Sequence, residues 1–234
     1  MVSVCIATYN GGRFISEMLE SVLTQIGYDD EIVVSDDGST DDTITKIEGL
    51  KDSRIRILHH DGNKSVVRNF ENALQNASGT IIFLADQDDV WLPGKLEKMV
   101  QILESCEVAV SDCHVVDTNL NIIKFSLFDT LQSSSGLIRN LYKNSYVGCC
   151  MAMRREVLDR ALPFPADIPI HDWWIGLVAE AAFSTEFIAE PLMLYRRHNN
   201  NASLTGDKSS FSVFRKVVWR LILVKNLVCR LWCR

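Results

Sequence analysis

Short apolar, β-branched runs alternate with helical patterns along the first 110 residues. The apolar runs predict strands over residues 2–7, 31–35, 54–59, 80–85 and 107–111. Between them, apolar positions at helical spacing predict helices over 14–23 and 66–77, and Pro93 indicates the first turn of another. This alternation is typical of βαβ units. We therefore expect an α/β fold with a Rossmann-like, mostly parallel central sheet flanked by helices.

The pattern is looser after residue 112. An apolar run predicts a strand over 146–153, a helix is expected to begin near residue 172, and linker-like composition follows over 199–210. We therefore expect one globular domain over residues 1–205, followed by a linker and a helical tail over 206–234.

The net charge of −6 conceals a difference between two parts of the chain. Residues 211–234 hold six cations and no acid, which leaves a charge of −12 on the rest. An acidic body argues against nucleic acid as a substrate, because phosphate contacts need a basic surface. The seven cysteines are odd in number without a CxxC pair, and the N-terminus lacks the pattern of a signal peptide. We expect a reducing, cytoplasmic compartment.

The C-terminal tail interleaves its six cations with apolar residues. Its longest apolar run, 221–224, is far shorter than the roughly 20 residues of a membrane-spanning helix. A basic amphipathic helix with tryptophan suits an anionic membrane surface, so we expect a peripheral location on the inner face of the plasma membrane. The alternative is packing against the acidic body or a partner subunit.

Polar and acidic residues follow three of the predicted strands, where an open α/β sheet binds its ligands. The carboxyl ends of these strands carry Thr8, Tyr9 and Asn10, then Asp36 and Asp37, then Asp86, Asp88 and Asp89. The sequence therefore predicts a ligand site at one edge of the sheet.

The stretch DQDDVW concentrates three carboxylates that repel one another unless they share a cation. Carboxylate oxygens suit Mg²⁺ or Mn²⁺, and these ions usually keep positions for substrate phosphates. The sequence thus favours a diphosphate ligand. Alternatively, Asp88 or Asp89 caps the following helix.

The segment SDDGSTDD contains a turn at Gly38, and Ser39 with Asp42 has the pattern of a capping box for the next helix. That interpretation leaves Asp36 and Asp37 unexplained. A carboxylate at this position could accept a hydrogen bond from N3 of uracil or thymine.

The motifs CIATYNGG, EIVVSDDGSTDD, VRNFENAL and FLADQDDVW resemble family 2 glycosyltransferases in order and spacing. The later HDWW and YRRHNNNAS resemble the rhamnosyltransferase-like branch of that family. The resemblance extends from residue 2 to about 205. It implies a GT-A fold and inverting transfer of a sugar from a UDP- or dTDP-linked donor. The acceptor would be a hydroxyl of a glycan or a lipid-linked molecule in cell-surface polysaccharide synthesis.

Specific roles follow from the resemblance. Asp88 would be the principal metal ligand, helped by Asp86 and His198, with Asp89 behind them. Arg196 could pair with the diphosphate. The implied nucleotide site comprises Thr8, Tyr9, Asn10, Asp36, Asp37, Arg68 and Asp86.

The resemblance also places the general base at Asp172, where an inverting transfer needs a carboxylate to deprotonate the acceptor hydroxyl. His171 departs from the acid that the family usually has there. The residues alone slightly favour a role for Asp172 as the N-cap of the apolar helix that follows it, and the resemblance shifts the balance towards catalysis. Trp173 and Trp174 are expected to divide between core packing and a platform for a sugar ring.

Other enzyme classes lack their motifs in this sequence. TYNGGRF is not the GxGxxG turn of a dinucleotide-dependent oxidoreductase, and neither a P-loop nor the glycine-rich basic loop of a nucleotidyltransferase is present. A nucleotide-sugar-binding module without catalysis is the other alternative. The presence of both Asp88 and Asp172 argues against it.

Overall fold

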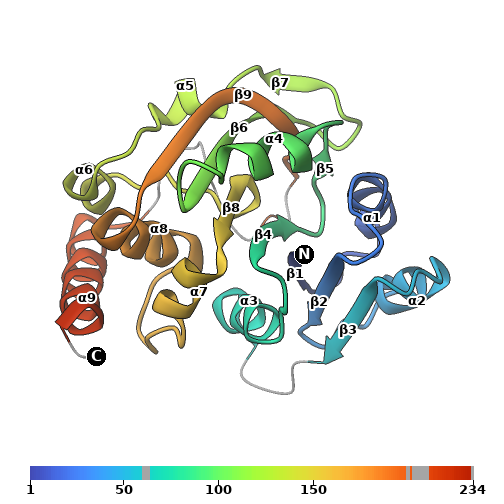
Figure 1. Ribbon diagram of the computed structural model, residues 1–234, viewed down its shortest axis with the longest axis horizontal. Helices are drawn as coiled ribbons and strands as arrows, with labels where there is room; N and C mark the ends of the chain where they lie inside the picture. Colours follow the sequence, from blue (N-terminus) through green and yellow to red (C-terminus); the bar gives the residue numbers. More distant parts are fainter. Residues whose placement is uncertain (60–63, 199–200, 202–210, 233–234) are drawn as a thin grey trace.

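The computed structural model describes residues 1–59, 64–198, 201 and 211–232. Strands and helices alternate through the first hundred residues, as the sequence predicts (Figure 1). The strands are β1 (Val2–Thr8), β2 (Glu31–Asp36), β3 (Ile55–His59), β4 (Ile81–Asp86), β5 (Val90–Trp91), β6 (Val108–Val116), β7 (Ile122–Lys124), β8 (Met151–Arg154) and β9 (Thr185–Arg196). The helices are α1 (Ile15–Leu23), α2 (Thr43–Gly49), α3 (Val66–Gln75), α4 (Lys95–Ile102), α5 (Leu127–Leu131), α6 (Leu137–Tyr142), η1 (Gly148–Cys150, a 3₁₀ turn), α7 (Arg155–Ala161), α8 (His171–Ala182) and α9 (Val213–Trp232).

The first four strands form the parallel half of the sheet. Their order is β3-β2-β1-β4, and each pairs in parallel with its neighbour. The chain moves outward from β1 to β3 and then returns to the other side of β1 as β4. Because the direction of winding reverses there, a crevice opens beyond the carboxyl ends of β1 and β4.

The second half of the sheet is mixed. β8 joins β4 to β6 by antiparallel pairing, and the long β9 then runs parallel to β6. β9 also pairs with the short β5, which follows the acidic loop after β4. β9 therefore pairs with β6 along its whole length and with β5 near its carboxyl end, which reaches the crevice.

Helices cover the sheet as the apolar stripes require. α3 packs against β1 and β2, while α1 and α2 contact each other on the opposite side (Figure 1). The apolar residues of α1, Met18 and Leu19 among them, are buried. The α/β expectation is confirmed, with a sheet that is parallel in its first half and mixed beyond.

Three local expectations are wrong. α4 begins at Lys95 with Gly94 as its N-cap at φ +85°, so Pro93 lies in the preceding turn, and neither Asp88 nor Asp89 caps the helix. Residues 146–153 do not form one strand, because the 3₁₀ turn η1 precedes β8, which begins only at Met151. Ser39 is not part of a capping box, since its hydroxyl donates to Asp36.

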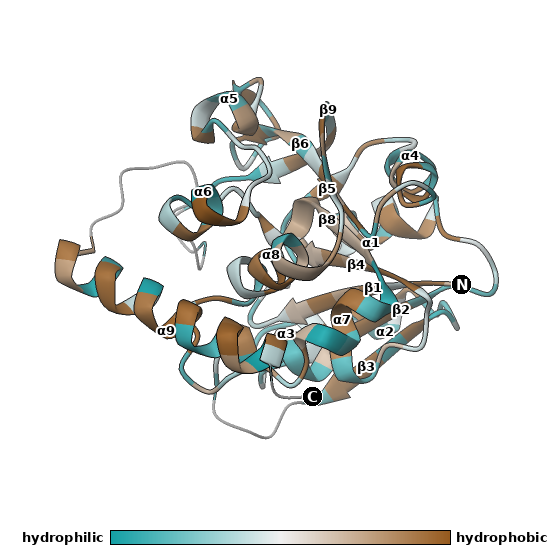
Figure 2. Cartoon of the chain, turned by 60° about the vertical axis from the view of Figure 1, so that its left-hand side comes forward, coloured by the Kyte–Doolittle hydropathy of each residue, from teal (hydrophilic) through white to brown (hydrophobic). Residues whose placement is uncertain are grey.

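The C-terminal helix α9 lies along one side of the molecule, next to α6 and α8 (Figures 1 and 2). Leu223 and Leu227 are its buried residues. No helix in the described ranges combines the length and apolar composition needed to cross a bilayer. The domain boundary expected at residues 205–206 and nearly all of the expected linker, 199–210, lie outside the described residues.

Candidate active site

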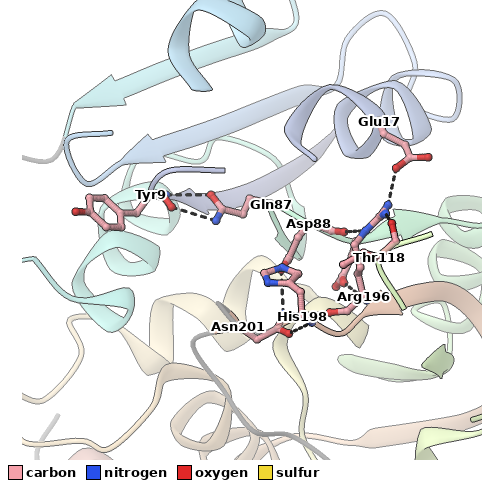
Figure 3. A network of polar contacts seen from close by, with 9 residues as sticks. Tyr9, Glu17, Gln87, Asp88, Thr118, Arg196, His198 and Asn201 are labelled. Carbon is pink, nitrogen blue, oxygen red and sulfur yellow. Dashed lines mark hydrogen bonds and ion pairs between the residues drawn. The ribbon is translucent and has the colours of Figure 1, made fainter. Parts of the chain in front are cut away.

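The carboxyl ends of β1 and β4 are joined by the Gln87 side chain, whose amide makes the pair of backbone hydrogen bonds that a neighbouring strand would make. Gln87 accepts a hydrogen bond from the Tyr9 amide at 3.0 Å and donates one to the Tyr9 carbonyl at 3.2 Å (Figure 3). A Cβ at Gly11 would lie 2.2 Å from the same side-chain oxygen, so a larger residue there would displace Gln87 from these hydrogen bonds. Gln87, the residue between Asp86 and Asp88, thus fixes the loop after β1.

Asp88 lies at the centre of a polar network (Figure 3). Its Oδ2 accepts hydrogen bonds from Nδ2 of Asn201 at 3.0 Å and lies 2.7 Å from Nε2 of His198. The His198 ring stacks on Phe14 at 5.1 Å. The structure therefore brings together two of the expected metal ligands, and Asn201 joins them.

Arg196 does not face the open site. Its side chain donates to the carbonyls of Asp88 at 2.7 Å and Thr118 at 2.9 Å and to the carboxylate of Glu17. With 2% of its surface exposed, this guanidinium cross-links α1, the acidic loop and β9. The expected pairing of Arg196 with a diphosphate conflicts with this internal role.

The neighbouring Arg197 takes the opposite direction, as successive residues at the end of a strand do. It lines a pocket of about 570 Å³ beside Asp88. Arg13, His198 and Tyr9 line the same pocket. Alternation along β9 is the signal in the sequence that distinguishes Arg197 from Arg196.

Asp86, Asp89 and the Cys149 thiol lie behind Asp88, with their ligand atoms within 4.8 Å of one another. Burial and the charges of Asp88 and Asp172 raise the pKa of Asp86 to about 7. The pKa values of Asp88 and Asp89 are also raised, mainly by burial.

This donor set fits a divalent cation. One oxygen of Asp89, Oδ2, is buried without a hydrogen-bond partner among the described residues, while Oδ1 accepts the Arg196 amide at 2.9 Å. An ion bound by Asp88, His198 and their neighbours would offset the mutual repulsion of these carboxylates. The role expected for Asp89, behind the principal ligands, agrees with its position.

Asp172 lies in the first turn of α8 rather than at its N-cap, which is Ile170. Its Oδ2 accepts a hydrogen bond from the Gly148 amide of η1 at 3.1 Å, and its Oδ1 accepts one from Trp173 N at 2.5 Å. Burial raises the pKa of this carboxyl to about 7. The turn η1 links Asp172 to Asp86 across 85 intervening positions, because its Gly148 amide binds Asp172 and its Cys149 thiol lies beside Asp86.

His171 packs beneath this carboxylate. Its ring stacks on Phe70 at a centroid distance of 4.0 Å, and neither nitrogen has a hydrogen-bond partner among the described residues. Burial lowers the pKa of the imidazole to about 3, so it is neutral. His171, which stands where the resemblance implies an acid, is therefore uncharged.

Two of the expected nucleotide ligands hold the loops together instead. The Asp36 carboxylate accepts hydrogen bonds from the Thr8 hydroxyl at 3.0 Å, the Gly38 amide at 3.0 Å and the Ser39 amide at 2.8 Å. Both Thr8 and Asp36 are buried. These hydrogen bonds explain why β2 ends in an acid, and they require no contact between Asp36 and a nucleotide base.

Asn10 and Asp37 also make loop contacts. Asn10 adopts φ +49°, and its side chain accepts the Thr40 amide at 2.8 Å. Asp37 accepts the Ser65 amide at 2.9 Å, ahead of α3. Tyr9 remains half exposed, with Nζ of Lys64 4.9 Å from its ring centroid. Tyr9 and Asp37 stay predictions for the nucleotide base.

Arg68 lies on α3, where it pairs with Glu71 and donates to the carbonyls of Phe164 and Pro165 at 3.2 Å. Its expected place near the nucleotide stays a prediction.

Both tryptophans of HDWW belong to the core. The Trp173 indole donates to the Asn140 carbonyl at 2.7 Å, and the Trp174 indole donates to the Ala161 carbonyl at 3.0 Å. Both side chains are buried, so the expected sugar platform is wrong for this conformation. Arg220 and Arg230 of α9 lie over the two rings at 5.8 and 5.7 Å from their centroids.

Comparison with known sequences gives a consistent family. The profile of glycosyl transferase family 2 matches residues 3–162. An uncharacterised glycosyltransferase of Nostoc is 30% identical over 232 residues, 90% of this chain and 70% of that protein. A UDP-Glc:alpha-D-GlcNAc-diphosphoundecaprenol beta-1,3-glucosyltransferase of Escherichia coli is 30% identical over 76% of this chain and 68% of its own length. The dTDP-rhamnosyl transferase RfbG of Shigella flexneri is 29% identical over 94% of this chain and 79% of its own length.

Solved structures share the fold. S. aureus TarS 1-349 in complex with UDP-GlcNAc superposes with a TM-score of 0.73 at 19% identity, over 96% of this chain. This chain spans 66% of that TarS chain, about two thirds. The mannosyltransferase PcManGT of Pyrobaculum calidifontis, in complex with GDP-Man and Mn²⁺, has a TM-score of 0.63 at 19% identity over 96% of this chain and 64% of its own. The chain has the GT-A fold, belongs to glycosyl transferase family 2 and is a glycosyltransferase.

Proposed function

We propose that this protein transfers a sugar, with inversion at the anomeric carbon, from a UDP- or dTDP-linked donor to the hydroxyl of a glycan or lipid-linked acceptor. The observation that carries the proposal is the placement of Asp172. This buried carboxylate accepts the Gly148 amide at 3.1 Å, and the adjacent Cys149 thiol lies within 4.8 Å of Asp86 and Asp89. One side of the crevice thus has a base and the other has groups for a diphosphate.

Asp172 takes the proton in this reaction. The acceptor oxygen attacks the anomeric carbon, the bond from that carbon to the diphosphate oxygen breaks, and the acceptor proton moves to the carboxylate. A pKa of about 7 suits a general base at neutral pH. The Gly148 hydrogen bond holds one carboxylate oxygen in place.

The other side of the crevice holds the leaving nucleoside diphosphate. Arg197 and Arg13 line the pocket beside Asp88 and supply positive charge for phosphate oxygens. A Mg²⁺ or Mn²⁺ ion bound at Asp88, with Asp86, Asp89 and His198 around it, would neutralise charge on the diphosphate. Tyr9 and Asp37 would meet the base. The relatives that use UDP-Glc or carry a dTDP-rhamnosyl name support these two donor classes.

A donor screen tests this proposal. UDP- and dTDP-sugars should raise the unfolding temperature in the presence of Mn²⁺, because a ligand that binds only the folded state stabilises it. Arg197→Met should reduce this stabilisation by weakening the donor about tenfold or more, the scale of a charge-assisted hydrogen bond. Lys124→Met, on β7, is the matched control. Equal stabilisation of the parent and Arg197→Met would remove Arg197 from the donor site.

The surface of α9 supports a peripheral membrane location for this reaction. Its solvent-facing side is mostly apolar and includes Phe214, Val217, Leu221, Val224, Val228 and Trp232 (Figure 2). We call these six residues the apolar face of α9. The adjacent α6 adds exposed Ile138 and Tyr142.

The cations of α9 divide between two surfaces. Arg220 and Arg230 face the body, where they donate to backbone carbonyls, whereas Arg215 and Lys225 are exposed, and Lys225 also pairs with Asp167 at 3.8 Å. Exposed tryptophan and tyrosine beside cations suit an anionic lipid surface. A second copy docked on the same face would bring like charges together. We therefore propose contact with anionic lipid at the cytoplasmic side of the membrane.

Vesicle sedimentation tests the membrane contact. The parent should pellet with phosphatidylglycerol vesicles. The double variant Leu221→Glu, Val228→Glu should lose at least about tenfold in affinity, because acids replace two apolar side chains that would be buried in the lipid. Ile123→Glu on β7 is the control, since it places an acid on another exposed apolar side chain. Undiminished pelleting of the double variant would contradict the proposal. A dimer that the variant abolishes would assign the face to a second copy.

A further inference from the structure

Lys95, the first residue of α4, has no exposed surface. Its ammonium donates to the Cys149 carbonyl at 2.7 Å and contacts the Met193 sulfur at 3.1 Å. The Trp91 ring centroid lies 5.0 Å away. Within the described ranges, no carboxylate forms an ion pair with this ammonium. A buried cation is thus held by one carbonyl and softer partners.

A buried ammonium without an ion pair is costly, because it loses its hydration, and the negative charge of Asp89 offsets only part of that loss. Methionine has a similar length and would fill the space without that cost. Burial lowers the pKa of Lys95, as this desolvation requires. Core stability therefore does not explain this lysine. Its hydrogen bond to the Cys149 carbonyl is the contact that a methionine could not make.

The Cys149 carbonyl belongs to η1, and η1 contacts both halves of the candidate site. The Gly148 amide binds the Asp172 carboxylate at 3.1 Å. The Cys149 thiol lies beside Asp86 and Asp89. A small displacement of this three-residue turn would therefore move the base relative to the donor carboxylates.

The packing of η1 leaves no room for such a displacement on the side of α8. A Cβ at Gly148 would lie 3.1 Å from Nε2 of His171 and 3.6 Å from Cβ of Asp172. On the opposite side, Lys95 connects the turn to α4 and, through Met193, to β9. The turn is held between the helix that carries the base and the elements that support the acidic loop.

We propose that Lys95 is a positioning residue that anchors η1, and through it sets Asp172 against the donor carboxylates. This inference rests on the proposed function for its catalytic consequence but not for its structural part. Lys95 touches neither substrate nor reacting atoms. It acts through the Cys149 carbonyl, so its loss should change turnover more than donor affinity.

Lys95→Met tests the anchor in the full-length protein, with Lys98→Met as the matched control on the same helix, where the side chain is exposed and pairs with Glu190. Hydrogen exchange measured by mass spectrometry on peptides spanning 146–152 should be faster in Lys95→Met than in the parent or Lys98→Met. Turnover should fall about tenfold or more, because small misplacements of a catalytic group cost rates of that order. The donor KM should stay within about threefold.

Two results would overturn the proposal. One is exchange at 146–152 equal to that of the control. The other is a joint fall of turnover, donor affinity and unfolding temperature, which indicates general destabilisation. Where Lys95→Met does not fold, Gly148→Ala displaces the same turn from the opposite side and should lower kcat alone; parent-like kcat in that variant would contradict the anchor. If the parent transfers no sugar, the exchange comparison still decides whether Lys95 holds η1.

Discussion

Asp172→Asn should abolish sugar transfer while making the protein more stable at neutral and alkaline pH. Removal of a general base costs about 10²–10⁴ in rate, so kcat should fall by roughly that factor. Asparagine keeps an oxygen that can accept the Gly148 amide, so the loop geometry should survive. Donor affinity in the presence of Mn²⁺, measured by calorimetry, should change little.

The stability effect follows from the raised pKa of Asp172. The carboxyl titrates at about 7 in the folded protein against an ordinary value of 3.8, so between these values the unfolded chain loses its proton first. Stability therefore falls as pH rises from about 4 to 7, by about 1.4 kcal/mol per pH unit, and the full cost remains above 7. Asparagine removes this cost. Thermal unfolding without divalent cation should show the gain at pH 8 and little gain at pH 4.

The same pKa sets the pH profile of turnover. The base works when deprotonated, so kcat of the parent should rise with pH through about 7 and then level off. Asp159→Asn, an exposed acid on α7, serves as the control and should match the parent in both rate and stability. Near-parent turnover of Asp172→Asn would remove Asp172 as the base.

Asp88→Asn should cost about 10²–10³ in kcat/KM, the range seen when one preorganised electrostatic contact to a developing charge is removed. The substitution keeps the shape of the side chain but removes the negative charge beside His198 and Asn201. Calorimetry should show that the parent binds donor much more tightly with Mn²⁺ than in EDTA, and that the variant loses most of this difference.

The control for this experiment is Asp129→Asn, an exposed acid in the first turn of α5. It should retain the full dependence on Mn²⁺. If donor affinity of the parent is the same in EDTA, the metal assignment fails as a whole. If Asp88→Asn keeps the metal dependence, another residue of the cluster must be the principal ligand.

The parallel half of the fold was predictable because each of its strands is a separate apolar run. β1 to β4 lie within about a residue of their expected bounds. Burial on both faces makes β1, β2 and β4 almost continuously apolar, whereas the edge strand β3 is only partly buried. β5 and β7 were missed because strands of two and three residues leave no periodicity to detect. η1 was mistaken for strand because apolar composition alone does not separate a buried 3₁₀ turn from a strand.

The sequence predicted those parts of the candidate site that depend on residue type. It did not predict the parts that depend on the direction in which the backbone points a side chain. The structure brings Asp88 and His198 into contact and links Asp172 to Asp86 through η1, while the roles assigned to these residues stay predictions. Gln87, Asn201 and Arg197 were missed because amides and neighbouring arginines acquire their roles from the backbone that orients them. The sequence does not distinguish a buried tryptophan from one exposed as a platform for a sugar ring. The burial of Trp173 and Trp174 depends on packing by α7 and α9.

The hydrogen bond from the Arg196 amide to Asp89 spans 107 positions of the chain. A nascent chain that has emerged only as far as residue 162, the end of the family match, already carries the acidic loop but none of β9 and no Asp172. Closing so long a loop is entropically unfavourable until the later strand docks, so the reaction centre depends on late, long-range contacts. Synthesis of the recognisable motifs and assembly of a working centre are therefore separate events, and a shortened chain would retain the family signature without its chemistry.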